Sequence, residues 1–460
     1  MMRWKKITII IVILFFLLGG TVFFLFNGKD MVDTQSIAIN TLSAMQKVTK
    51  FLPIQDDTKR ELDVISKLTE ALAKKDDVER SYMVLLQNNL ELRPGGGFLG
   101  QYAIIKIKNG EVVSHFIEDA NLLDQRITTK VTPPYPFRRM MSLKRWKFRD
   151  SNYSPDYPTN VEKAEYFYRL AGRASDFDGV IAVNADVLNE VLKITGPITV
   201  PGYPGEYNSE NAVLKLEEQV EKGFETQGIN VQDRKLILKS MGKIIIERLT
   251  SMRNIPKIAE FSLEQLRNKN IMLNFKDQNL QQMVASVHWD GSVAQDWNGD
   301  YLMVVDANMG ALKSDYYVKR SLKYEVDLTG EKPVATLYIT YNHTAKGGDW
   351  RTSDYHSYLR ILTPKGSTLL EREMVSYPSI QEELNKTSMG FILHALIGRT
   401  TTARIKYELP VGVKDSYRLL IQKQSGVGDL PVVVKVKTAE GEFEKNEIIK
   451  KDLQMEFLKQ

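Results

Sequence analysis

The chain contains no cysteine. That absence excludes disulfide bonds, thiol catalysis and cysteine-ligated metal sites together. Histidine is scarce as well, and the few present show no HExxH motif or other close ligand spacing. We therefore expect each of them to be an ordinary surface or strand residue; they are His115, His288, His343, His356 and His394.

Strong charge of one sign is also missing. The formal net charge is only +5, and Arg3, Lys5 and Lys6 supply more than half of it. A general nucleic-acid surface is therefore not expected, and any anion binding must come from a local cluster. The sequence has no Gly-x-Ser-x-Gly elbow either, so it gives no support for a nucleophilic serine.

Long hydrophobic runs are absent except for one, which extends from Ile7 to Phe26 without a charge. About 20 helical residues cross the ~30 Å hydrocarbon core of a bilayer. The alternative is a cleaved signal peptide, whose apolar region has about 7–15 residues and ends at small residues. Here the run is longer and ends in the bulky residues Phe23 to Phe26. The pattern favours a membrane anchor.

The charges beside this run predict its orientation. Arg3, Lys5 and Lys6 precede it, whereas Lys29 beyond it is followed by Asp30. By the positive-inside rule, the N-terminus is cytoplasmic and the rest of the chain is exported. We expect a single-pass protein of the cell membrane that contacts the lipid bilayer through residues 7–26. Export without disulfides is typical of a bacterium whose envelope proteins fold without them.

The pattern of apolar residues predicts an α/β domain followed by a β-sandwich. Residues 1–30 form the cytoplasmic stub and anchor, and helical periodicity over 31–80 indicates a membrane-proximal stalk. Strands and helices alternate over 81–320, which is typical of an α/β/α layered domain. Short alternating strands over 321–445 indicate a sandwich. The charged tail, 446–460, is expected to fray.

One long stretch, about residues 118 to 158, is rich in Pro, Arg, Tyr and Asp and has no periodicity. A loop of this length inside a compact domain is uncommon and is usually functional or disordered.

A glycine-rich string, Glu91 to Gly100, is the most unusual local pattern. Gly95, Gly96 and Gly97 lack Cβ atoms, so the backbone can approach a ligand closely and its N–H groups can cradle an anion. Arg93 adds charge-assisted donors. No Gly-Lys-Ser/Thr follows, so this is not a Walker loop. The alternative is a tight turn between strands with an Arg–Glu pair.

A second constellation extends from Arg149 to Pro158. Asp150 and Asp156 could hold Mg²⁺, which takes one or two carboxylates and leaves water positions for a phosphate. Arginines before and within it, in the range 138–149, would suit a diphosphate. The alternative is that these carboxylates are ordinary turn and N-cap residues, with Asp156 capping the helix that follows.

These motifs resemble a known bacterial family. Leu86 to Gly100 is similar to the opening motif of the family called domain of unknown function 4012, and Arg149 to Pro158 is similar to its second motif. Shorter resemblances follow at Asp178-Gly179-Val180, Gly196-Pro197 and Asn308 to Asp315. The resemblance implies a membrane-anchored envelope protein.

The family is in turn distantly similar to LytR–CpsA–Psr proteins, which transfer glycopolymers from polyprenyl diphosphate carriers to peptidoglycan with Mg²⁺. That similarity implies that Arg93 and Gly95–Gly97 lie near a carrier diphosphate. The transferases carry Ser-x-Pro-Arg-Asp where this chain has FIEDANLL, from Phe116 to Leu123. Asp119 remains as a candidate catalytic carboxylate beside Asp150 and Asp156.

FIEDANLL lacks the arginine of the transferase motif. Arg126 or one of the arginines from Arg138 to Arg149 would have to replace it. Two hypotheses remain open. The chain is either a phosphotransferase-like enzyme or binder acting on polyprenyl-diphosphate-linked glycans or peptidoglycan, or a non-catalytic surface or scaffold protein that binds an envelope partner through the sandwich.

Overall fold

The computed structural model describes residues 56–230, 234, 236–249, 255–414 and 417–457. The predicted membrane segment, 7–26, and the first part of the predicted stalk lie outside these residues. Within the described part, no helix is long and apolar enough to cross a bilayer.

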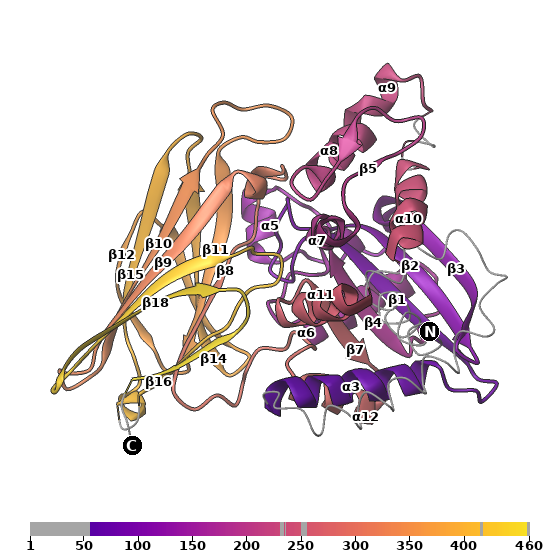
Figure 1. Cartoon of the computed structure of the whole chain (residues 1–460). Coiled ribbons are helices and arrows are strands. Elements are labelled where there is room, and N and C mark those ends of the chain that lie inside the picture. Colours follow the sequence, from indigo (N-terminus) through magenta and orange to yellow (C-terminus); the bar gives the residue numbers. More distant parts are fainter. Residues whose placement is uncertain (1–55, 231–233, 235, 250–254, 415–416, 458–460) are drawn as a thin grey trace. The chain divides into compact units, whose positions relative to one another are not determined.

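The chain forms two compact units, each built from several stretches of sequence (Figure 1). The first, called here the α/β unit, contains the described residues from 56 to Gln87 together with Gly100–Leu123 and Ala174–Asp290. The second, called the sandwich unit, contains Asn88–Leu99, Asp124–Arg173 and Gly291–Gln460. The glycine-rich string therefore folds with the C-terminal part of the chain, although a linear division near residue 320 predicts that it belongs to the α/β domain.

A five-stranded sheet of mixed direction forms the centre of the α/β unit, in the order β3-β2-β1-β4-β7. β1 and β4 are parallel, whereas β4–β7 and β2–β3 are antiparallel. All six residues of β4 are buried, as the short apolar run predicts. The bounds are β1 Glu79–Asn88, β2 Phe98–Lys108, β3 Glu111–Asp119, β4 Gly179–Asn184 and β7 Ile271–Phe275, with a separate small pair β5 Ile198–Thr199 and β6 Glu206–Tyr207.

Helices complete the core of this unit. α3 is amphipathic, and its residues Val64, Ile65, Leu68 and Leu72 are buried in the same core as the sheet. α3 contacts α12 (Figure 1), so from residue 56 onward the segment predicted as a stalk is part of the α/β unit. The bounds are α3 Asp56–Leu72, α7 Asp186–Thr195, α8 Ala212–Glu218, η2 Gln219–Gly223, α9 Phe224–Thr226, α10 Leu236–Leu249, α11 Ile255–Arg267 and α12 Gln278–Ser286.

Two six-stranded sheets face each other in the sandwich unit and share one apolar core (Figure 1). Their orders are β12-β15-β10-β9-β17-β18 and β13-β14-β11-β8-β16-β19. The bounds are β8 Asp300–Val305, β9 Val318–Asp327, β10 Val334–His343, β11 Tyr355–Pro364, β12 Thr368–Glu373, β13 Ser376–Glu383, β14 Lys386–Ala395, β15 Thr400–Glu408, β16 Arg418–Ile421, β17 Leu430–Thr438, β18 Gly441–Ile449 and β19 Leu453–Glu456.

The sandwich extends beyond the predicted range of 321–445 at both ends. The apolar run from Tyr301 to Val305 predicts a strand that closes the α/β domain, but this strand, β8, pairs with β11 and β16 at the centre of the second sheet. The C-terminal stretch expected to fray contains the end of β18 and all of β19, and Met455 and Phe457 are buried in the core. Leu453, Met455 and Phe457 alternate with polar residues, which is why this part of the charged tail forms a strand that packs on the core.

The stretch from 118 to 158, predicted to be functional or disordered, is ordered by short helices and internal bonds. The carboxylate of Asp124 accepts a hydrogen bond from the backbone N–H of Phe148, and Lys147 donates to the backbone carbonyl of Asp124. The two ends of the loop are thereby held together. The helices of this stretch are α4 Ala120–Arg126, α5 Tyr135–Met140, η1 Phe148–Asp150 and α6 Tyr157–Leu170. The sandwich unit also contains the short helices η4 Ser314–Tyr316 and η5 Val411–Val413.

Candidate functional site

Arg93, the predicted diphosphate ligand, is buried, with only 1% of its surface exposed. One terminal nitrogen donates to Glu91 at 2.8 Å and lies 3.5 Å from Asp150, and the other donates to the carbonyl of Asn308 at 2.8 Å. The guanidinium also lies over the ring of Phe98. Its Nε makes no hydrogen bond within the described residues. The cation is therefore neutralised by protein carboxylates rather than presented to solvent.

Burial and ion pairing have opposite effects on this group. Burial disfavours the charge on Arg93, but Glu91 and Asp150 outweigh it, and the pKa of Arg93 is raised. The pKa of Glu91 is also raised, because its desolvation outweighs the attraction of Arg93. Arg93 therefore stays charged with a partner of its own, as the alternative prediction of an Arg–Glu pair in a tight turn requires.

The three glycines beside Arg93 are packed against protein atoms. A Cβ on Gly97 would lie 2.5 Å from the backbone carbon of Asn88, and one on Gly95 would collide with Asn160. The N–H of Gly95 donates to the backbone carbonyl of Asn152 at 3.0 Å. The N–H of Gly96 donates to the backbone carbonyl of Arg93 at 2.9 Å. The space that the missing Cβ atoms leave beside the backbone is therefore occupied by other protein atoms rather than left open for a ligand.

The two candidate metal ligands of the second motif have different partners. Asp150 is 4% exposed and lies between Arg93 and Arg149. Asp156 is the N-cap of α6: one of its oxygens accepts from Thr159, and the other accepts from the N–H of Val293. The helix-capping alternative therefore describes Asp156, and both of its oxygens are used by the protein.

The remaining candidates are placed elsewhere. Asp119 belongs to the α/β unit, where it accepts hydrogen bonds from the backbone and side chain of Asn121. Arg126 is the exposed last residue of α4, and Arg149 lies 3.4 Å from the carboxylate of Asp124. Burial raises the pKa of Asp124 to about 6, against the opposing effect of Arg149.

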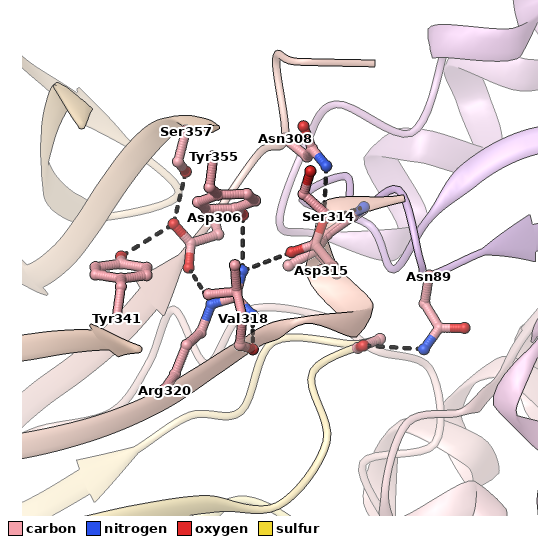
Figure 2. A network of polar contacts seen from close by, with 12 residues as sticks. Asn89, Asp306, Asn308, Ser314, Asp315, Val318, Arg320, Tyr341, Tyr355 and Ser357 are labelled. Atoms are coloured by element: carbon pink, nitrogen blue, oxygen red, sulfur yellow. Dashed lines mark hydrogen bonds and ion pairs between the residues drawn. The ribbon is translucent and has the colours of Figure 1, made fainter. Parts of the chain in front are cut away.

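A second arginine, Arg320, has only 9% of its side chain exposed and lies among carboxylates and hydroxyls (Figure 2). Arg320 donates to Asp306 at 2.8 Å, to Asp315 at 2.5 Å and to the hydroxyl of Tyr355 at 2.7 Å. Asp306 in turn accepts from Ser357, at 2.6 Å. Nearby carboxylates and hydroxyls outweigh desolvation, so the pKa of Arg320 is raised.

The two arginine clusters are joined. The other oxygen of Asp315 accepts hydrogen bonds from the backbone N–H of Leu92 and from the side-chain amide of Asn308. The backbone carbonyl of Asn308 in turn accepts the hydrogen bond from Arg93. The amide of Gln424 donates both to the carbonyl of Arg93 and to that of Asp306. We call this set the buried polar network; its members are Glu91, Arg93, Asp150, Asp306, Asn308, Asp315, Arg320 and Gln424.

Sequence reasoning missed part of this network. Asn308 and Asp315 lie in a sequence motif, but no local pattern marks Asp306, Arg320 or Gln424. Gln424 lies 331 residues beyond Arg93, and no local pattern connects the two. All eight members belong to the sandwich unit. The arrangement can hold segments together, because each charge has a buried partner of opposite charge.

No group of three or more His, Asp or Glu side chains is placed to hold a metal ion among the residues that the structure describes. Two hollows lie over β9, β10, β17 and β18 of the first sandwich sheet, and no candidate site residue lines either of them.

The segment from Asp124 to Asp150, called here the basic segment, carries six exposed basic side chains and no exposed carboxylate. Its only carboxylates, those two terminal residues, are both buried. The segment lies on the second sandwich sheet, where Phe137 packs with Tyr358 and Ile392. Its exposed basic residues are Arg126, Lys130, Arg138, Arg139, Lys144 and Arg145.

Comparison with family models matches residues 77–220 to the family described as protein of unknown function (DUF4012). The resemblance predicted from the motifs is confirmed for this part of the chain. The match includes the glycine-rich string and the basic segment, whereas Asn308 to Asp315 lie beyond it. Comparison with curated proteins finds no match.

Proposed function

We propose, from a family match that carries no function of its own, that this chain is a single-pass membrane protein whose exported part is a non-catalytic binding module. The anchor is the uncharged run from Ile7 to Phe26, and the basic residues before it support a cytoplasmic N-terminus. The ligand that we propose is an anionic, phosphate-bearing glycan of the cell envelope.

The burial of Arg93 carries the non-catalytic part of this proposal. A transferase of the LytR–CpsA–Psr kind needs arginines and carboxylates that can reach a diphosphate, with a metal ion between them. Arg93 is instead bonded to Glu91, Asp150 and a backbone carbonyl, and both oxygens of Asp156 accept protein hydrogen bonds. Opening this network to a substrate would leave buried charges unpaired, which costs several kcal/mol.

The basic segment supports the choice of an anionic partner. Its six exposed basic side chains have no exposed carboxylate among them in the sequence from 124 to 150. Phe137 and its apolar neighbours hold the segment against the sheet, so its charges are presented by a fixed backbone. Arginine suits phosphate, because its planar fork donates two parallel hydrogen bonds. A polymer with repeated phosphates can contact several such side chains at once, so its affinity grows with chain length.

The test compares three probes: inorganic pyrophosphate, farnesyl diphosphate and a long poly(glycerol phosphate). Calorimetry on the full chain in detergent should show tightest binding to the polymer, weakened by added salt. Arg138→Glu, Lys144→Glu and Arg145→Glu together should lower the polymer affinity at least tenfold. A matched control reverses three lysines of the α/β unit, Lys67, Lys75 and Lys108, and should leave the affinity within twofold.

Two outcomes would overturn the proposal. Binding of farnesyl diphosphate with Mg²⁺ that survives the triple reversal would place the ligand away from the basic segment. Transfer of a glycan from a polyprenyl diphosphate carrier by the purified chain would show catalysis. The anchor is tested separately: a reporter fused at the C-terminus should be active only outside the cytoplasm.

A further inference from the structure

Two histidines far apart in sequence meet on the second sandwich sheet. His356 in β11 and His394 in β14 are directly opposite each other in the antiparallel register. Their neighbours Tyr355 and Leu393 are fully buried, and side chains alternate between the two faces of a strand. The histidines therefore lie on the outer face, where His394 is exposed and His356 is half-buried.

The Nδ1 atoms of the two imidazoles face each other. Their Nδ1 atoms are 2.5 Å apart, with ring centroids at 4.7 Å and planes inclined by 76°. At this separation only one Nδ1 can carry a proton, so the other presents a lone pair. Burial, together with the nearby His394, lowers the pKa of His356. The unprotonated Nδ1 therefore presents the kind of lone pair through which imidazole binds metals.

A metal ion can replace the shared proton. Zinc–imidazole bonds are about 2.0–2.1 Å long, so two nitrogens on one ion lie roughly 3 Å apart. A small rotation of the exposed His394 ring would lengthen the Nδ1–Nδ1 distance from 2.5 Å to this value. Asp354 is the nearby carboxylate: its negative charge acts on His356, and one of its oxygens accepts the N–H of Ile397. Its charge favours a cation at this position.

We propose that His356 and His394 form a surface site for a divalent transition-metal ion of the class that imidazole prefers, Zn²⁺, Ni²⁺ or Cu²⁺, with water completing its coordination. The ion links β11 to β14 through one Nδ1 atom from each strand. Hard cations such as Mg²⁺, which take oxygen ligands, are not bound there. This site is independent of the anion binding proposed for the basic segment.

Cu²⁺ is the most sensitive probe, because it binds nitrogen sites most tightly among these ions and reports its ligands in electron paramagnetic resonance. The full chain, purified without a histidine tag, should bind one equivalent at the site, with hyperfine coupling to two imidazole nitrogens. His356→Ala and His394→Ala should each weaken binding at least tenfold. His115→Ala, on an exposed position of β3, is the matched control and should change nothing.

Thermal unfolding gives a second readout that does not depend on spectroscopy. Zn²⁺ should raise the Tm of the wild type and of His115→Ala, but not that of the His356→Ala/His394→Ala double variant, and Mg²⁺ should raise none of them through this site. Circular dichroism checks that each variant is folded. Equal Cu²⁺ affinity in the wild type and the double variant, or a spectrum with one nitrogen ligand, would overturn the proposal.

Discussion

Arginine occurs in two opposite environments within the sandwich unit. Arg93 has 1% of its surface exposed and is bonded to carboxylates and carbonyls, whereas Arg138 and Arg145 are exposed in a segment whose carboxylates are buried. A buried, paired arginine contributes to the fold, because removing either partner leaves an uncompensated charge. An exposed arginine costs the fold little when it is changed and remains available to a ligand.

The glycine-rich string and the basic segment show that a sequence motif and an accessible binding surface can lie in different places. The glycine-rich string has the composition of an anion-binding loop, yet its close approaches are occupied by Asn88 and Asn160. The basic segment lies mostly before the second motif, yet it carries six exposed basic side chains.

Replacing Arg93 with Ala should have the largest effect. The change leaves Glu91 and Asp150 buried without their cation, which typically costs 3–5 kcal/mol. Denaturant unfolding of the full chain should show a loss of that order. Arg138→Ala is the matched control and should change the unfolding free energy by less than about 0.5 kcal/mol. Similar losses in the two variants would remove the distinction between them.

Asp300 extends the comparison to a buried carboxylate without a cation. Burial raises its pKa to about 6, although the hydroxyls of Tyr324 and Tyr417 donate to it. Between about pH 4 and 6 the folded state therefore holds a proton that the unfolded state has lost, and the unfolding free energy falls as pH rises. The shift corresponds to about 3 kcal/mol over this window.

Asp300→Asn should remove that contribution, so the unfolding free energy measured at pH 4 and pH 7 should differ less than in the wild type. Asp124, whose pKa is also raised to about 6, remains in the variant and continues to act in the same direction. An unchanged pH dependence in the variant would contradict the assignment to Asp300.

Gly97→Ala tests whether the glycine string is filled by protein. Its Cβ would lie 2.5 Å from the backbone of Asn88, which cannot move aside as a flexible side chain could. We expect a loss of roughly 1–3 kcal/mol in unfolding free energy. Gly100→Ala is the control, because a Cβ there meets nothing within 4 Å. A loop left open for a ligand would tolerate both changes equally.

The smallest effect on stability is expected for the triple charge reversal at Arg138, Lys144 and Arg145. Exposed substitutions of this kind usually change the unfolding free energy by less than about 0.5 kcal/mol each. Polymer binding should nevertheless fall at least tenfold. A large loss of stability without a change in binding would show that these residues are structural.

Local patterns predict much of the fold. The pattern of apolar residues from Phe98 to Lys108 predicts a strand, and this strand is β2 with the same bounds; the pattern from Asp186 to Ile194 predicts a helix, and this helix is α7. Alternation fails for β12 and β18, which are almost entirely exposed and carry charges on both faces. The pattern from Asn208 to Val287 predicts mainly helix, yet β7 lies within it, because a short apolar run does not distinguish a buried strand from a helix.

The site is less predictable, because its partners are distant in sequence. The Arg93–Glu91 pair and the cap at Asp156 are local, and the sequence predicts both as alternatives to ligand binding. The bonds from Arg93 to Asn308 and from Gln424 to Arg93 depend on how the strands are ordered, which no spacing rule provides. His356 and His394 illustrate the same limit: only the register of β11 and β14 brings them together.

Diphosphate binding by the triple charge-reversal variant tests the central claim most directly. This variant retains Arg93, the three glycines and Asp150, so any specific site at the glycine-rich string is intact. Calorimetry with farnesyl diphosphate and Mg²⁺ should detect no binding. Wild-type affinity in this variant, abolished by adding Arg93→Lys while the chain stays folded, would show instead that Arg93 receives a ligand.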